Sequence, residues 1–134
     1  VVGSRWIKGG GIEDWPWDRI LLSRGATWYS RMVLGVAVND LTGGFNCYRR
    51  KVLETIGPEN IHADGYGFQI EMKYRALKNG FTLKEIPIIF PDRRKGKSKI
   101  SRLIVWEALL LVWKLRFSGG VSGGSTRQAS GRPR

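Results

Sequence analysis

The sequence predicts an α/β fold, because segments with a helical pattern alternate with short runs typical of β-strands. The chain has 134 residues, of which 42% are hydrophobic, enough for one domain with a modest core. The clearest alternation is a helical pattern over residues 68–78, ended by Asn79 and Gly80, and followed by an Ile-rich strand over residues 81–90. Alternation of helices and strands along the chain is typical of α/β proteins.

The first part of the chain predicts a strand, a loop and a helix. Residues 1–4 have the composition of a strand already under way, and the first residue is Val, so we expect the chain to begin inside a larger protein. Residues 5–16 contain three consecutive glycines and are expected to form a flexible loop. An imperfect amphipathic pattern over residues 17–34 predicts a helix that begins after Asp14 or Pro16.

The remaining elements are short, except for a helix near the carboxyl end. Residues 39–44 are expected to form a polar turn and residues 45–48 a short strand. A helix over about residues 50–56 should stop at Gly57. Residues 101–117 predict a helix that is apolar around almost its whole circumference and must therefore pack against protein or lipid.

The charge and the rare residue types narrow the classes of function. A net charge of +12 attracts anions, whether nucleic acid, acidic lipid headgroups or phosphorylated small molecules. One cysteine and one histidine exclude an internal disulfide and a zinc cluster of His and Cys, and they fit a reducing compartment that faces the cytosol. The six tryptophans form no aromatic and basic stripe that would stack bases, so nucleic acid is the weakest of these classes.

Arginine and lysine recur in the predicted loops, where they could grip phosphate oxygens. Arg5 follows the first strand, Arg19 lies near a helix start, and residues 93–99 are strongly basic. Arginine offers a planar fork of donors, and Gly96 lets the backbone approach an anion closely. The alternative for residues 93–99 is a solvated basic loop.

Two polar groups of residues could reach a ligand. Asp40 and Thr42 stand in a glycine turn and could both face a sugar hydroxyl; the alternative is an Asx-type turn in which Asp40 caps backbone amides. Gln69 and Glu71 stand near an expected helix start, where one or both could reach a site, although a helix start also favours Glu71 electrostatically.

Seven short motifs, in order and spacing, resemble the dolichol-phosphate (polyprenol-phosphate) mannose synthase family of family-two glycosyltransferases. Each is unspecific alone, but seven in register are specific. The resemblance is close over residues 1–99, loose over the terminal helix, and ends at the tail. The motifs are Gly3-Ser4-Arg5, Gly9-Gly10-Gly11, Trp17-x-Arg19 with Ser23-Arg24-Gly25-Ala26, Asp40-x-Thr42-Gly43-Gly44-Phe45-x-x-Tyr48-Arg49, Gly65-Tyr66-x-Phe68-Gln69-x-Glu71-Met72, Glu85-x-Pro87-Ile88 and Arg93-x-x-Gly96-x-Ser98-Lys99.

The resemblance implies a partial GT-A (Rossmann-like) glycosyltransferase domain that lacks its amino-terminal nucleotide-binding half. Residues 1–99 would be the acceptor-side half, residues 100–117 an amphipathic helix, and residues 118–134 a disordered tail rich in Ser, Gly and Arg. The implied activity is a dolichyl-phosphate β-D-mannosyltransferase reaction, the inverting transfer of mannose from GDP-mannose to a polyprenyl phosphate. Transfer of glucose or a modified sugar, or a non-catalytic remnant that binds lipid phosphate, are the alternatives.

The resemblance also implies a location and partners. The protein would be peripheral, on the cytoplasmic face of the cell membrane, with the membrane surface as a partner and nucleic acid excluded; a membrane-anchoring subunit or domain is a further partner that it allows. No transmembrane helix is expected, because residues 103–117 are interrupted by three charged residues and fall short of the roughly 20 residues that span a bilayer. Trp106 and Trp113 suit a membrane interface, and packing on the missing half of the domain is the alternative.

Site residues follow from the resemblance by matched position. Arg5, Arg19 and Arg93 would be the catalytic residues, lining the acceptor-phosphate and donor-diphosphate site. The substrate-binding residues would be Ser4, Asp40, Thr42, Gly44, Gln69, Glu71 and, on a mobile loop, Ser98 and Lys99.

One feature of the family is absent from this sequence. No Asp-x-Asp pair occurs, although the family uses such a pair to hold Mg or Mn between the donor phosphates. We therefore expect the ligands of Mg or Mn in the missing amino-terminal half, with none in this piece. This piece alone is expected to be inactive.

Overall fold

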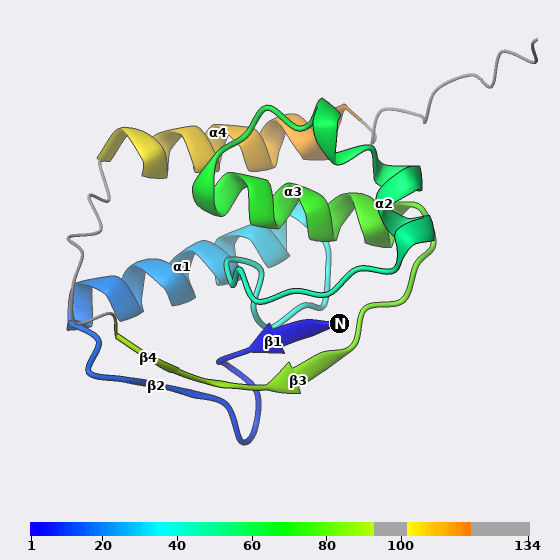
Figure 1. Cartoon of the computed structure of the whole chain (residues 1–134). Helices are drawn as coiled ribbons and strands as arrows, with labels where there is room; N and C mark the ends of the chain where they lie inside the picture. Colours follow the sequence, from blue (N-terminus) through cyan, green and yellow to red (C-terminus); the bar gives the residue numbers. More distant parts are fainter. Residues whose placement is uncertain (93–101, 119–134) are drawn as a thin grey trace, which may run out of the picture.

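The computed structural model describes residues 1–92 and 102–118, in which helices pack on one side of short parallel strands (Figure 1). This mixture of helices and parallel strands confirms the α/β prediction. The strands are β1 (Val2–Ser4), β2 (Gly11–Glu13), β3 (Glu85–Pro87) and β4 (Ile89–Pro91). The helices are α1 (Trp17–Leu34), α2 (Arg50–Ile56), the 3-10 turn η1 (Pro58–Asn60), α3 (Gly65–Lys78) and α4 (Arg102–Phe117).

The four strands form two parallel pairs. β1 pairs with β3, with Val2 opposite Glu85, and β2 pairs with β4, with Gly11 opposite Ile89. The strand predicted over residues 81–90 is therefore two three-residue strands, each with its own partner. The strand predicted over residues 45–48 is reduced to a single antiparallel bridge between Val2 and Asn46.

The glycine-rich segment after β1 forms a loop over residues 5–10, but the loop that we expected over residues 5–16 is interrupted by β2. Gly9 has a φ of 89°, which side chains rarely adopt, and a Cβ on Gly10 would lie 2.5 Å from the carbonyl oxygen of Ser4. After this loop the chain continues in the direction of β1, and β2 lies beside β4, where the Gly11 amide donates to the Ile88 carbonyl at 3.0 Å. The prediction was wrong only for residues 11–13, because β2 forms through a partner that is distant in sequence.

The helix predictions are confirmed, with one shifted boundary. α1 spans the predicted residues and ends at Gly35, which has a φ of 67° and whose amide donates to the Arg31 carbonyl. α3 begins at Gly65, three residues before the predicted start, after the extended N-cap residue Asp64. Glu71 is consequently inside the helix and not at its start.

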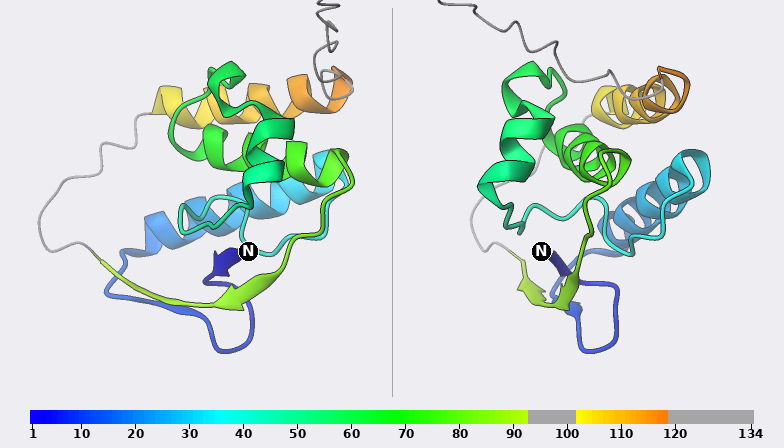
Figure 2. Two further views of the ribbon diagram at one scale, coloured as in Figure 1. Left: turned by 45° about the vertical axis from the view of Figure 1, so that its right-hand side comes forward. Right: turned by 90° about the vertical axis from the view of Figure 1, so that its right-hand side faces the viewer.

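Two apolar clusters hold the helices together. The larger one joins α1, α3 and α4, which Figure 2 shows nearly end on in its right-hand view. The smaller one lies between α2 and α3. The larger cluster comprises Leu34, Val38, Leu41, Ile70, Tyr74, Val112 and Leu115, and the smaller one Ile56, Met72 and Ala76.

Helix α1 buries small polar side chains and exposes large apolar ones. Ser23, Thr27 and Ser30 are buried, whereas Trp17 and Trp28 are 78% and 65% exposed. Small side chains at a contact allow two helices to approach closely, and α1 packs beside α4. The outer apolar residues, as we call them below, are Trp17, Leu21, Trp28 and Met32 of α1 with Leu103, Trp106, Leu110, Trp113 and Phe117 of α4. No described helix is long and apolar enough to cross a membrane.

Candidate functional site

The centre of the candidate site is a buried ion pair between Arg5 and Asp40. Arg5 follows β1, and Asp40 lies in the loop after α1. The Nε and Nη2 atoms of Arg5 each donate to one carboxylate oxygen of Asp40 at 2.7 Å, and the Arg5 amide donates to the same carboxylate at 3.0 Å. Asp40 is 0% exposed and Arg5 only 7%. Such a bidentate pair holds the guanidinium in one fixed plane.

Two hydroxyl groups complete the surroundings of this guanidinium. Arg5 Nη2 also donates to Thr42 Oγ1 at 3.1 Å and to Ser23 Oγ at 3.4 Å, and the two hydroxyl oxygens lie 3.1 Å apart. Ser23 belongs to one of the seven motifs but was not predicted as a site residue. Its signal was available, because Ser23 stands one helical turn after Arg19 and therefore shares a helix face with it.

Lys73 and Glu85 hold the loop of residues 39–44 in place through hydrogen bonds to its backbone. The ammonium of Lys73 donates to the carbonyl oxygens of Leu41 and Gly43 at 2.9 and 2.7 Å. The carboxylate of Glu85, in β3, accepts hydrogen bonds from the amides of Asn39 and Asp40. Asp40 also accepts from the Gly43 amide at 2.9 Å, so the predicted Asx-type turn exists together with the ion pair.

Lys73 is fully buried, and burial lowers its pKa from 10.5 to about 8. Asp40 and Glu85 act in the opposite direction and favour the charged ammonium, while Arg5 disfavours it. Spacing alone did not identify Lys73, because nothing in its neighbourhood distinguishes a buried lysine from one on a helix surface.

Gln69 and Glu71 lie on different sides of α3. The Asn46 side-chain amide donates to Gln69 Oε1 at 2.7 Å and to the Gly43 carbonyl at 3.1 Å, which ties Gln69 to the loop. A Cβ on Gly44 would lie 3.7 Å from Gln69 Nε2. Glu71 instead accepts from Arg75 Nε at 2.8 Å. The structure therefore brings Gln69 and Gly44 to the site and places Glu71 elsewhere.

Arginine and tryptophan side chains alternate around Arg5. The Arg5 guanidinium carbon lies 5.3 Å from the Trp6 ring centroid and 5.2 Å from that of Trp15. Arg19 stacks on Trp15 at 3.9 Å, and Arg24 stacks on Trp6 at 4.8 Å. Cations over the faces of electron-rich rings are stabilised electrostatically. This arginine–tryptophan cluster gathers several positive charges at one place, where they can bind an anion.

Arg19 forms an ion pair with one acidic residue. Of the remaining predicted site residues, Ser4 is described by the structure and three others are not. Arg19 Nη1 donates to Asp92 at 2.6 Å in a half-buried ion pair. Ser4 is 0% exposed, and its hydroxyl has no hydrogen-bond partner within residues 1–92 and 102–118. Arg93, Ser98 and Lys99 lie outside the described residues.

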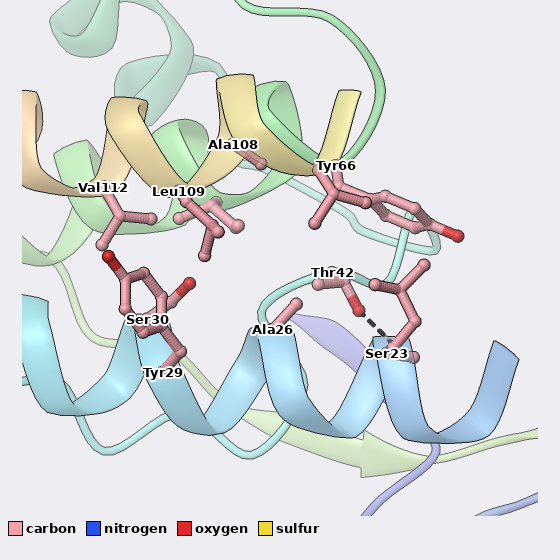
Figure 3. Close-up of a pocket in the computed structure, with 12 residues that line it drawn as sticks. Ser23, Ala26, Tyr29, Ser30, Thr42, Tyr66, Ala108, Leu109 and Val112 are labelled. Carbon is pink, nitrogen blue, oxygen red and sulfur yellow. Dashed lines mark hydrogen bonds between the residues drawn. The ribbon is translucent and has the colours of Figure 1, made fainter. Parts of the chain in front are cut away.

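A small apolar cavity lies between α1 and α4 and ends at the hydroxyl pair. Its volume is about 30 Å³. Figure 3 shows Ser23 and Thr42, joined by their hydrogen bond, at one end, with Ala108, Leu109 and Val112 of α4 facing α1. The polar cluster around Arg5 thus adjoins an apolar slot between two helices.

A larger cavity of about 650 Å³ lies on the other side of α3, next to α4. It is lined by both acidic and basic side chains, among them Glu71, Arg75, Glu107 and Lys114. No three His, Cys, Asp or Glu side chains gather as a possible metal site anywhere in residues 1–92 and 102–118.

Comparisons with known proteins agree on one family. The chain is 44% identical over 118 residues to the polyprenol monophosphomannose synthase of Mycolicibacterium smegmatis, a match that covers 87% of this chain and 44% of that protein. It is 39% identical over 112 residues to the undecaprenyl-phosphate mannosyltransferase of Micrococcus luteus, covering 84% of this chain and 46% of that protein. The chain spans less than half the length of these two curated relatives. No family model and no solved structure matches it. Over its matched residues, this chain belongs to the polyprenol-phosphate mannose synthase family.

Proposed function

We propose that this chain is the acceptor-side half of a GT-A glycosyltransferase that transfers mannose from GDP-mannose to a polyprenyl phosphate. The observation that carries the proposal is the pairing of Arg5 and Arg19 around one indole, beside an apolar slot between α1 and α4. A lipid phosphate has the same two parts, an anionic head and an apolar chain. The names of the two curated relatives support the same acceptor and sugar.

In the proposed reaction, an oxygen of the acceptor phosphate attacks the anomeric carbon of mannose. The bond between that carbon and the GDP oxygen breaks, and GDP leaves with the electron pair, so the configuration inverts. The acceptor phosphate is already anionic at neutral pH and needs little help from a base. Because two negatively charged phosphate groups must come close together, cationic side chains stabilise the transition state.

Arg19 is the residue that we expect to meet the acceptor phosphate. Its ion pair with Asp92 is 21% and 31% exposed on the two sides, so a ligand can reach it, whereas Arg5 is engaged with Asp40, Thr42 and Ser23. The exposed Gly44 would border the sugar with Gln69 beside it, and the buried Asp40 and Thr42 would hold their loop in place. The described residues offer no cluster that fits Mg or Mn, and we expect the metal ligands elsewhere in the complete enzyme.

Transfer of labelled mannose from GDP-mannose to polyprenyl phosphate, with Mg, tests the proposal. The chain is compared alone and joined to an amino-terminal half from a matching relative. Transfer only by the joined protein is the expected result. Transfer by the chain alone would overturn the need for that half, and transfer only from a glucose donor would overturn mannose as the sugar. Binding of lipid phosphate without transfer from any donor would favour a non-catalytic remnant.

Replacing Arg19 by Gln in the joined protein should lower the rate of mannose transfer about 100-fold or more, because a preorganised cation is lost where charge develops. Arg50→Gln is the matched control, since Arg50 is 92% exposed and pairs only with Glu54 among the described residues; its rate should stay unchanged. Equal rates for Arg19→Gln and the wild type would remove Arg19 from the proposed site.

We also propose that the outer apolar residues of α1 and α4 rest on the membrane surface. Lys114 and Arg116 lie in the last turn of α4, where they can meet anionic lipid headgroups. Replacing both Trp106 and Trp113 by Ala should reduce flotation of the protein with phosphatidylglycerol vesicles several-fold, because each tryptophan anchors at the interface. The same flotation for the double variant and the wild type would favour packing of α4 on another protein surface.

A further inference from the structure

Trp15 is the buried indole that Arg5 and Arg19 share, and the proposed reaction gives it no role of its own. It lies in the short link between β2 and α1 and is only 9% exposed. The ring of Phe90, in β4, meets it edge-on, with the centroids 6.0 Å apart and the planes at 89°. Its position is therefore fixed by the strand pair β2–β4.

The Trp15 ring is shared by two arginines from different elements. The guanidinium of Arg19, in α1, lies 3.9 Å from the ring centroid, and that of Arg5, after β1, lies 5.2 Å from it. Two cations gathered in this way repel each other. The Trp15 indole attracts both guanidinium groups through the partial negative charge of its π face, and this attraction offsets part of their repulsion.

Arg19 and Trp15 each keep one hydrogen-bond donor without a partner in the described part of the chain. The Nε of Arg19 and the indole Nε1 of Trp15 are both buried and have no partner within residues 1–92 and 102–118. Buried donors without an acceptor are costly, and the oxygens of an anion would supply acceptors to both.

From this geometry we infer that Trp15 is a positioning residue that holds Arg5 and Arg19 together for one phosphate group. The inference rests on the proposed function, because the phosphate is that of the polyprenyl acceptor. Trp15 then contributes to the affinity for the phosphate group and contributes nothing to the affinity for the apolar chain.

Calorimetric titration of the 134-residue chain with farnesyl phosphate and with farnesol separates these two contributions. Trp15→Leu should weaken binding of farnesyl phosphate about tenfold, the effect of losing a desolvated cation–π contact. Its affinity for farnesol should be unchanged. Trp15→Phe keeps a weaker π face and should lose only about threefold for farnesyl phosphate.

Phe81→Leu is the control, because it shortens a partly buried aromatic side chain in the α2–α3 cluster, away from any arginine of the site. This variant should keep the wild-type ratio of the two affinities. A ratio unchanged in Trp15→Leu, or in Trp15→Phe if the leucine variant does not fold, would overturn the role of Trp15. Equal weakening for farnesyl phosphate and farnesol would show a merely structural role and also overturn it. A wild-type chain that does not prefer farnesyl phosphate to farnesol would instead overturn the proposed acceptor site, and this inference with it.

Discussion

Replacing Asp40 by Asn should lower the free energy of unfolding by about 3 to 5 kcal/mol, the cost of leaving a buried charge without its partner. Arg5 directs its backbone amide, Nε and Nη2 at the Asp40 carboxylate, and neither side chain is open to water. An asparagine of the same size removes the negative charge and offers one oxygen where two are used. Urea unfolding of the variant and the wild type measures the difference.

Glu54→Gln is the matched control for this prediction. Glu54 pairs with Arg50 at the same distance of 2.7 Å, but the two side chains are 60% and 92% exposed. Water and salt screen such a pair, so the variant should change the free energy of unfolding by about 0.5 kcal/mol or less. A loss for Asp40→Asn no larger than that of the control would mean that Arg5 finds other acceptors when the carboxylate is gone.

The contribution of Lys73 to the free energy of unfolding should rise by about 3 kcal/mol as the pH increases from 8 to 10.5. Burial lowers the pKa of Lys73 to about 8, against 10.5 for an exposed lysine. Below pH 8 the ammonium is charged in both states, and the folded state bears the full cost of burying it. Between the two values the folded protein releases the proton while the unfolded chain keeps it, so the folded state gains stability as the pH rises.

Tyr48 limits this rise at the upper end of the range. Burial raises its pKa from 10.0 to about 12, so above pH 10 the unfolded chain ionises first and stability falls. Chemical unfolding at a series of pH values should therefore give a maximum near pH 10. Lys73→Met should flatten the curve between pH 8 and 10, and Tyr48→Phe should remove the fall above pH 10. A rise that persists in Lys73→Met would assign it to another group.

The helices could be predicted closely because their signals are local. α1 occupies the predicted residues, with Gly35 in the left-handed conformation just beyond its end. β2 could not be predicted, because a glycine-rich segment becomes a strand only when β4 lies beside it. The strands are short and depend on partners that are far away in the sequence, whereas the helical pattern needs no partner to be recognised.

The sequence predicted which residues form the candidate site better than it predicted how they contact one another. Asp40, Thr42 and Arg5 do come together, as expected from their motifs. Gln69 joins them, whereas Glu71 does not, since residues two positions apart on a helix face different directions. Lys73 was missed because only the folded chain shows that its ammonium ends beneath the loop of residues 39–44.

The packing of α1 against α4 also limits how early this chain can fold during translation. α1 ends at Leu34 and its neighbour α4 begins only at Arg102, and β1 likewise waits for β3. Contacts between such distant segments form late and slowly. Until α4 has been synthesised, the face of α1 that carries Ser23, Thr27 and Ser30 is not covered. The nascent chain then exposes this face as well as the tryptophans on the opposite face. Early contact with a lipid surface or a chaperone would shield the tryptophans until α4 arrives.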